Sequence, residues 1–242
     1  PASGEPTALV NPIEAEKFKH LPGAITPCLG YKRLEAELAR VLKGQRRLAM
    51  EYSSFGRLPY VALVDAGTIE LVRQCGCEIV SSADLVAAFQ AALSAEQIAT
   101  HRIAAHNLIE IKDDAFRFIA DSLTSGNSIT EYDVVQFVLR KFDEDDMMTD
   151  HSPICGVDAH AGDPHYEPGA GNSSTIKRGQ LVLLDIWAKL KKDGAVFADI
   201  TWMAYAGTAA EISGKYNEIF SVLTKARDTA VSFLRDNIDK RP

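Results

Sequence analysis

The sequence predicts an α/β (α+β) protein in two parts, residues 1–93 and residues 94–242. Three observations support this prediction. Residues 31–93 alternate helical patterns with short strand-like runs, which indicates a small α/β unit. A long amphipathic helical pattern then begins at Ser94, and two strand-like runs that each contain an aspartate follow within residues 181–201.

The first part is expected to begin irregularly, because prolines recur through residues 1–30 with little periodicity. From Tyr31 to Leu42 the apolar residues recur at helical spacing. Further helices are expected over residues 68–74 and 83–93. Short strands are expected over residues 47–53, 60–64 and 78–80.

The second part opens with Ser94 and Gln97 at the spacing of a capping box. Gly126 and Asn127 are expected to end the long helix, and Thr130 to begin the next. The apolar stripe of the long helix is predicted at Ile98, Ala105, Leu108, Ile109, Ala115, Phe116, Ile119 and Leu123. We expect residues 143–146, an acidic run, to be a solvated helix end, residues 152–179 to form a loop, and residues 214–236 to form a last amphipathic helix.

Composition narrows the functional classes. The chain is 46% hydrophobic and 24% charged, which is typical of a soluble globular protein. A formal net charge of −7 argues against non-specific nucleic-acid binding, which depends on Lys and Arg. Because there is neither a membrane-length apolar run nor a secretory leader, we expect a cytoplasmic protein with no membrane partner and reduced cysteines. Without a starting Met, the chain is expected to be cut at both ends.

Asp185 and Asp199 each lie inside an apolar run, where an unpartnered carboxylate is costly. The polar turn ending at Asp193-Gly194 predicts a β-hairpin. If that turn centres on Lys192, the two aspartates face each other and repel, and a bound cation would reverse the repulsion. Alternatively, each aspartate pairs with an arginine, or the turn shifts and one side chain reaches solvent.

The stretch CGVDAHAGDPHYEPGAGNSSTIKRGQLVLLD (155–185), followed by Ala-Asp-Ile-Thr (198–201), resembles the pita-bread metallopeptidases. These include Xaa-Pro aminopeptidases, prolidases and methionine aminopeptidases, with creatinase as a metal-free relative. The likeness covers residues 94–242 as the first half of a pita-bread catalytic domain. Residues 1–93 resemble part of the small creatinase-type N-terminal α/β domain.

The resemblance implies a metal-dependent exopeptidase that uses two divalent ions (Mn, Co or Zn) on a peptide or dipeptide, as a homodimer. Asp185 would chelate one metal, Asp199 would bridge two, and His165 would assist catalytically near the scissile bond. The family's remaining ligands, one His and two Glu, are expected beyond residue 242. His160 lies in the same loop and is the rival of His165, which the Pro-His-Tyr context favours.

Three features depart from the family pattern. The hairpin is longer, Trp187 replaces a small residue, and Trp202 stands where proline-handling members often carry Arg. We therefore expect both tryptophans to reshape the substrate pocket, and a requirement for proline stays open. Two alternatives also stay open: a peptidase-like binding protein without activity, and a creatinase-like hydrolase without metal.

Overall fold

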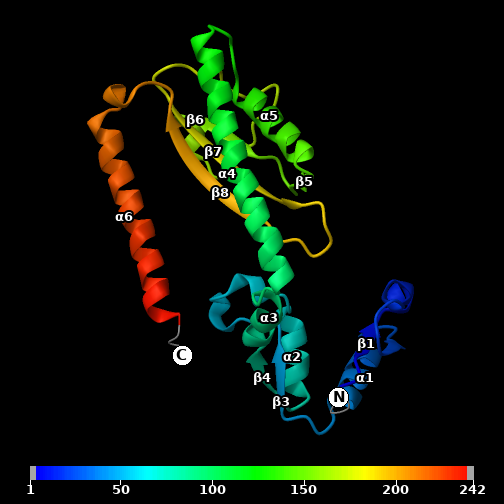
Figure 1. Cartoon of the computed structure of the whole chain (residues 1–242). Helices are drawn as coiled ribbons and strands as arrows, with labels where there is room; N and C mark the ends of the chain where they lie inside the picture. Colours follow the sequence, from blue (N-terminus) through cyan, green and yellow to red (C-terminus); the bar gives the residue numbers. More distant parts are fainter. Residues whose placement is uncertain (1–3, 239–242) are drawn as a thin grey trace. The chain divides into compact units, whose positions relative to one another are not determined.

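The computed structural model describes residues 4–238, which divide between Leu93 and Ser94 into two compact units (Figure 1). The mixture of helices and small sheets agrees with the predicted α/β class. Among the described residues, no helix combines the length and the apolar character that crossing a membrane requires. All four cysteines are free, and burial raises the pKa of the Cys155 thiol, with the charge of Glu131 adding to the shift.

The first unit contains two separate pairs of parallel strands with helices beside them. The strands β1 (Thr7–Val10) and β2 (Ala24–Pro27) pair, as do β3 (Arg47–Met50) and β4 (Glu78–Ser81). The helices are α1 (Tyr31–Leu42), α2 (Ala66–Gln74) and α3 (Ala83–Gln90). A small core forms where Leu42, Val72 and Cys77 meet.

Two predictions for this unit are wrong. The start of the chain is not an irregular arm, because four-residue strands at Thr7–Val10 and Ala24–Pro27 pair across a short 3-10 helix. Strands this short carry no readable period. Residues 60–64 do not form a strand either: Pro59 begins a 3-10 turn, and Tyr60 is 93% exposed, so the apolar run is not buried.

The second unit is a four-stranded antiparallel sheet with helices on one face. Its strands are β5 (Met147–Met148), β6 (Ile154–Val157), β7 (Leu181–Leu190) and β8 (Ala198–Tyr205). β7 pairs with all three others, and β6 and β8 flank the same stretch of it. The strand β6 was not predicted, because its four residues, Ile-Cys-Gly-Val, lie inside a segment rich in loop-forming residues.

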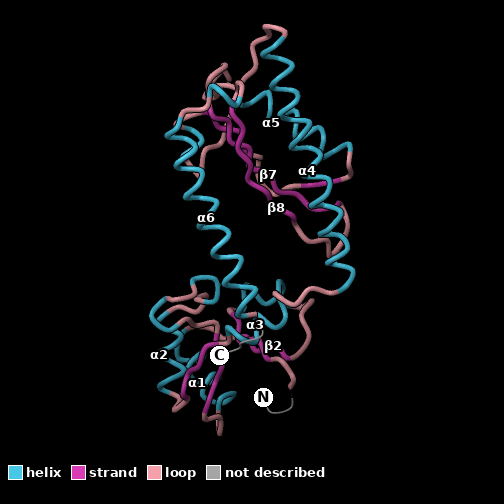
Figure 2. Tube along the Cα trace, turned by 60° about the vertical axis from the view of Figure 1, so that its left-hand side comes forward, coloured by secondary structure: helices cyan, strands magenta, loops and turns pink. Residues whose placement is uncertain are grey.

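The helices α4 (Ala95–Thr124) and α5 (Glu131–Glu144) cover the sheet from one side, as the side view in Figure 2 shows. Both begin with a complete capping box, formed by Ser94 with Gln97 and by Thr130 with Asp133. The buried stripe of α4 is rotated from the prediction, since Ile98 is 38% and Ile109 48% exposed. Its buried members are Thr100, Ala104, Leu108, Ile111, Lys112, Ala115 and Ile119.

The last helix, α6 (Gly214–Asn237), stands apart from the sheet in both views (Figures 1 and 2). The sequence predicts an inward apolar stripe on this helix, but no residue of α6 is buried. Phe220, for example, is 56% exposed and Leu223 is 59% exposed. The periodicity correctly predicts the helix, whereas its apolar stripe has no covering element within the described residues.

Candidate metal site and histidine loop

Asp185 and Asp199 lie on the same face of the β7–β8 hairpin, opposite to the face that α4 covers. Side chains alternate along a strand, and Leu184, Ile186 and Ala188 on β7 are each no more than 1% exposed. The odd-numbered residues therefore point to the open face. This alternation explains how two carboxylates fit into apolar runs: their neighbours enter the core, and they do not.

The register differs from the predicted one by two residues. Asp185 pairs with Thr201, and Asp199 pairs with Trp187, so the aspartates are diagonal neighbours and do not directly oppose each other. The prediction of a turn centred on Lys192 was wrong, because the chain turns one residue later. Gly194 supplies the positive φ (73°) that this turn uses, and the side chain of Lys192 bonds Glu96 on α4 at 2.7 Å.

The two carboxylates interact through space. Diagonal neighbours on adjacent strands are about 7–8 Å apart. Partial burial, and then the negative charge of Asp185, raise the pKa of Asp199. Asp185 accepts a 2.7 Å hydrogen bond from the Thr201 hydroxyl, which orients one of its oxygens. Two carboxylates whose joint ionisation is disfavoured suit a hard divalent cation, and these side chains fit the metal that the sequence predicts.

Trp187 stands beside the aspartates on the open face, and its indole Nε1 donates a 2.8 Å hydrogen bond to Asp150 Oδ1. Trp202 pairs with Leu184 and therefore points to the other face. There the Lys112 ammonium lies 4.3 Å from the centre of the indole ring. The expectation that both tryptophans shape one pocket is wrong for Trp202. This residue lies three positions from Asp199, the partner of Trp187, and side chains alternate between the two faces of the sheet.

The two loop histidines have different surroundings. His165 is exposed, and its backbone N–H donates to Asp163 Oδ1 at 3.0 Å. The ring of His160 stacks on Tyr166 with centroids 4.1 Å apart, and its Nδ1 lies 2.9 Å from Glu131 Oε1. The buried carboxylate of Glu131 thus meets His160, the rival candidate, and not His165.

Sequence reasoning missed Glu131, which is 0% exposed at the start of α5. An acidic residue directly after a helix N-cap is ordinary, and nothing in its local pattern distinguishes it. Three further histidines have partners elsewhere: His101 bonds the Phe197 carbonyl, 96 residues later in sequence, His106 lies near Glu110, and His151 lies near Asp150.

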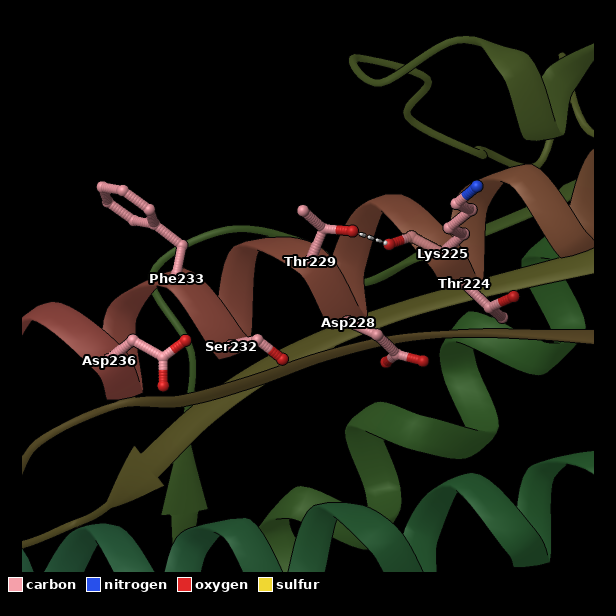
Figure 3. A pocket seen from close by; sticks show the side chains of 7 residues that line it. All are labelled: Thr224, Lys225, Asp228, Thr229, Ser232, Phe233 and Asp236. Atoms are coloured by element: carbon pink, nitrogen blue, oxygen red, sulfur yellow. Dashed lines mark hydrogen bonds between the residues drawn. The ribbon is translucent and has the colours of Figure 1, made fainter.

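Within residues 4–238 no cluster of three or more His, Cys, Asp or Glu side chains is arranged to hold a metal ion. Figure 3 shows a surface hollow, lined by Thr224, Lys225, Asp228, Thr229, Ser232, Phe233 and Asp236. All seven belong to α6, and the one bond drawn is the helical contact from the Thr229 hydroxyl to the Lys225 carbonyl, 2.7 Å. This hollow is lined by one helix only, and neither Asp185 nor Asp199 lines it. It is therefore not a candidate active site.

The second unit thus contains a helix-covered antiparallel hairpin that presents two carboxylates on its open face. The family model for metallopeptidase family M24 matches residues 103–239. The chain therefore belongs to metallopeptidase family M24, as the sequence motifs predicted. No curated protein matches it.

Solved structures agree on the fold at low sequence identity. The dipeptidase PepE from Mycobacterium ulcerans is 18% identical with a TM-score of 0.64, covering 96% of this chain and 58% of its own. A recombinant prolidase from Thermococcus sibiricus is 16% identical with a TM-score of 0.59, at the same coverages. An X-prolyl aminopeptidase from Caenorhabditis elegans, described as cytosolic with a di-nuclear active site, is 18% identical with a TM-score of 0.55, covering 81% of this chain and 31% of its own. This chain spans 58% of the length of the first two.

Proposed function

We propose that the protein is a metal-dependent exopeptidase that hydrolyses an N-terminal peptide bond or a dipeptide. The observation that carries the proposal is the placement of Asp185 and Asp199 as diagonal neighbours on the open face of the hairpin. Membership of a metallopeptidase family supports the same chemistry. Two divalent ions, Mn, Co or Zn, would be held by these carboxylates.

Four residues of this chain have roles in the proposed reaction. Asp185 and Asp199 bind and position the ions, and the Thr201 hydroxyl holds one oxygen of Asp185 in place. When bound, the ions supply an activated water and polarise the scissile carbonyl. His165 hydrogen-bonds the substrate near the bond that breaks and so stabilises the developing charge or transfers a proton.

The proposal extends to partners and place. The substrate is a peptide or dipeptide, and the protein works as a homodimer in the cytoplasm. The four free cysteines support a reducing compartment of this kind. A requirement for proline is left out of the proposal, because Trp187 stands where the family pattern has a small residue.

The test is metal removal from the complete protein. Dipeptide hydrolysis is expected to vanish after treatment with chelator and to return with Mn²⁺, Co²⁺ or Zn²⁺ added singly. Hydrolysis that survives rigorous metal removal would favour a metal-free hydrolase instead. Metal binding without hydrolysis of any dipeptide would favour a binding protein that has lost its activity.

A further inference from the structure

Glu131 is the most enclosed acidic side chain in the second unit, with 0% exposure. Its Oε1 accepts from the Val157 backbone N–H at 2.8 Å and lies 2.9 Å from His160 Nδ1. Its Oε2 accepts from the Tyr166 hydroxyl at 2.6 Å and from the Ser174 backbone N–H at 2.7 Å. Val157, Tyr166 and Ser174 donate, and His160 completes the set when its proton is on Nδ1. The geometry therefore suits an ionised carboxylate, which accepts only.

These four partners span the histidine loop, residues 157–174, from end to end. Val157 closes β6 at the start of the loop, and Ser174 lies near its end, where its carbonyl also accepts from the Glu131 backbone N–H at 3.1 Å. Tyr166 anchors the middle, directly after His165. One carboxylate thus ties together the end of β6, the 3-10 turn that begins at His160, and the irregular chain at Tyr166 and Ser174.

Close packing supports the same picture. A Cβ on Gly156 would come within 2.9 Å of the His160 backbone, so the loop folds tightly back over β6. The ring of Tyr166 stacks on His160 and is itself buried, with 9% exposure. Because Tyr166 is held by both its ring and its hydroxyl, the backbone of its neighbour His165 has little freedom.

We propose that Glu131 is a positioning residue, whose carboxylate fixes the histidine loop so that His165 is presented to the substrate. The inference rests on the proposed function for the role of His165, but the anchoring of the loop does not. Glu131 itself is buried and does not touch substrate. It acts through Tyr166 and through the two ends of the loop, and His160 is a part of the anchor in this scheme.

The kinetic test uses the complete protein loaded with Mn²⁺ and a dipeptide substrate. Tyr166→Phe removes one hydrogen bond to Glu131 and keeps the stacked ring, so kcat should fall about tenfold while KM and Mn²⁺ affinity stay near wild type. In the His165→Ala background the same change should have no further effect, because the residue that it positions is gone. The matched control is Tyr132→Phe, which makes the same chemical change at the residue directly after Glu131 on α5. Equal losses in both backgrounds would overturn the proposal.

A second measurement does not depend on activity. Glu131→Gln keeps the shape of the side chain but turns an N–H donor toward other donors. Hydrogen exchange of amides in residues 157–174 should accelerate at least about tenfold, while amides of α4 keep their protection. Unchanged loop exchange would overturn the anchoring, and with it the positioning role. If wild type hydrolyses no dipeptide with any metal, the proposed function fails, and the exchange result alone then decides whether Glu131 anchors the loop.

Discussion

Trp187 lies directly opposite Asp199 across the β7–β8 hairpin, and Asp185 lies one diagonal step away. The register thus places an indole, not a second carboxylate, as the cross-strand partner of the candidate bridging ligand. A 2.8 Å hydrogen bond from Trp187 Nε1 to Asp150 Oδ1 fixes the ring in this position. Any substrate bound at the two aspartates would meet this ring on the same face, which links metal binding and substrate choice.

If Asp185 and Asp199 are metal ligands, metal should stabilise the folded protein through them. Mn²⁺ is expected to raise the melting temperature of the complete wild-type protein, because a ligand that binds only the folded state shifts the equilibrium toward it. Asp185→Asn and Asp199→Asn should each lose most of this increase. Thermal unfolding with and without Mn²⁺ measures it. Asp193→Asn, at the exposed turn of the same hairpin, is the control and should respond as wild type does.

In the metal-free protein, the unfavourable ionisation of Asp199 beside Asp185 should make the free energy of unfolding depend on pH. Because the pKa of Asp199 is raised in the folded state, this state binds the Asp199 proton more tightly than the unfolded chain does. The contribution of Asp199 to the free energy of unfolding should therefore fall as pH rises from the ordinary value of 3.8 through the raised value, and stay lower above it.

Asp199→Asn removes the ionisable carboxyl group, so this fall in the free energy of unfolding should be absent in the mutant. Urea unfolding after metal removal, between about pH 3 and 7, compares wild type, Asp199→Asn and Asp193→Asn. A wild-type curve parallel to that of Asp199→Asn over the whole range would contradict the prediction.

Alanine variants of the two loop histidines, His165 and His160, should have different effects on catalysis and on the order of the loop. His165→Ala is expected to lower kcat by about 10²–10⁴, the usual range for a group that transfers a proton, with metal affinity close to wild type. His160→Ala should instead loosen the loop, because it removes a partner of Glu131. Steady-state kinetics, metal titration and loop hydrogen exchange of both variants distinguish the roles. A large kcat defect with an unchanged loop in His160→Ala would exchange the assignments.

Local patterns predicted the elements that carry their own signals. Ser94 and Thr130 begin helices because their side chains cap the backbone, and both capping boxes are present. Strand alternation predicted that Asp185 and Asp199 share a face, and a two-residue change in register preserves that result. The predictions that survived are those that depend on neighbours in sequence.

Long-range partners decided the rest. The register of β7 with β8 is fixed together with the pairing of β7 to β5 and β6, which lie more than twenty residues earlier in sequence. The burial of Glu131 depends on a loop that folds over it more than twenty residues later, and no local spacing encodes this. The β1–β2 pair likewise depends on strands too short to show a period. Tertiary contact, and not propensity, determines such features.

The position of Trp187 predicts how the protein selects its substrate. Trp187→Gly should open space beside Asp199, and kcat/KM for an Xaa-Pro dipeptide should rise relative to that for Xaa-Ala by about tenfold or more, the scale of a reshaped apolar pocket. Trp202→Gly removes an indole of the same size from the opposite face, where it contacts Lys112, and should leave that ratio unchanged. Competition between the two dipeptides in one reaction measures the ratio directly, without assuming equal enzyme concentrations. A loss of stability lowers the amount of folded enzyme for both dipeptides equally, so it does not change the ratio measured in one reaction. If Trp187 contacts the substrate, the ratio of Xaa-Pro to Xaa-Ala hydrolysis should change in Trp187→Gly and not in Trp202→Gly. Equal changes in the two variants would exclude that role.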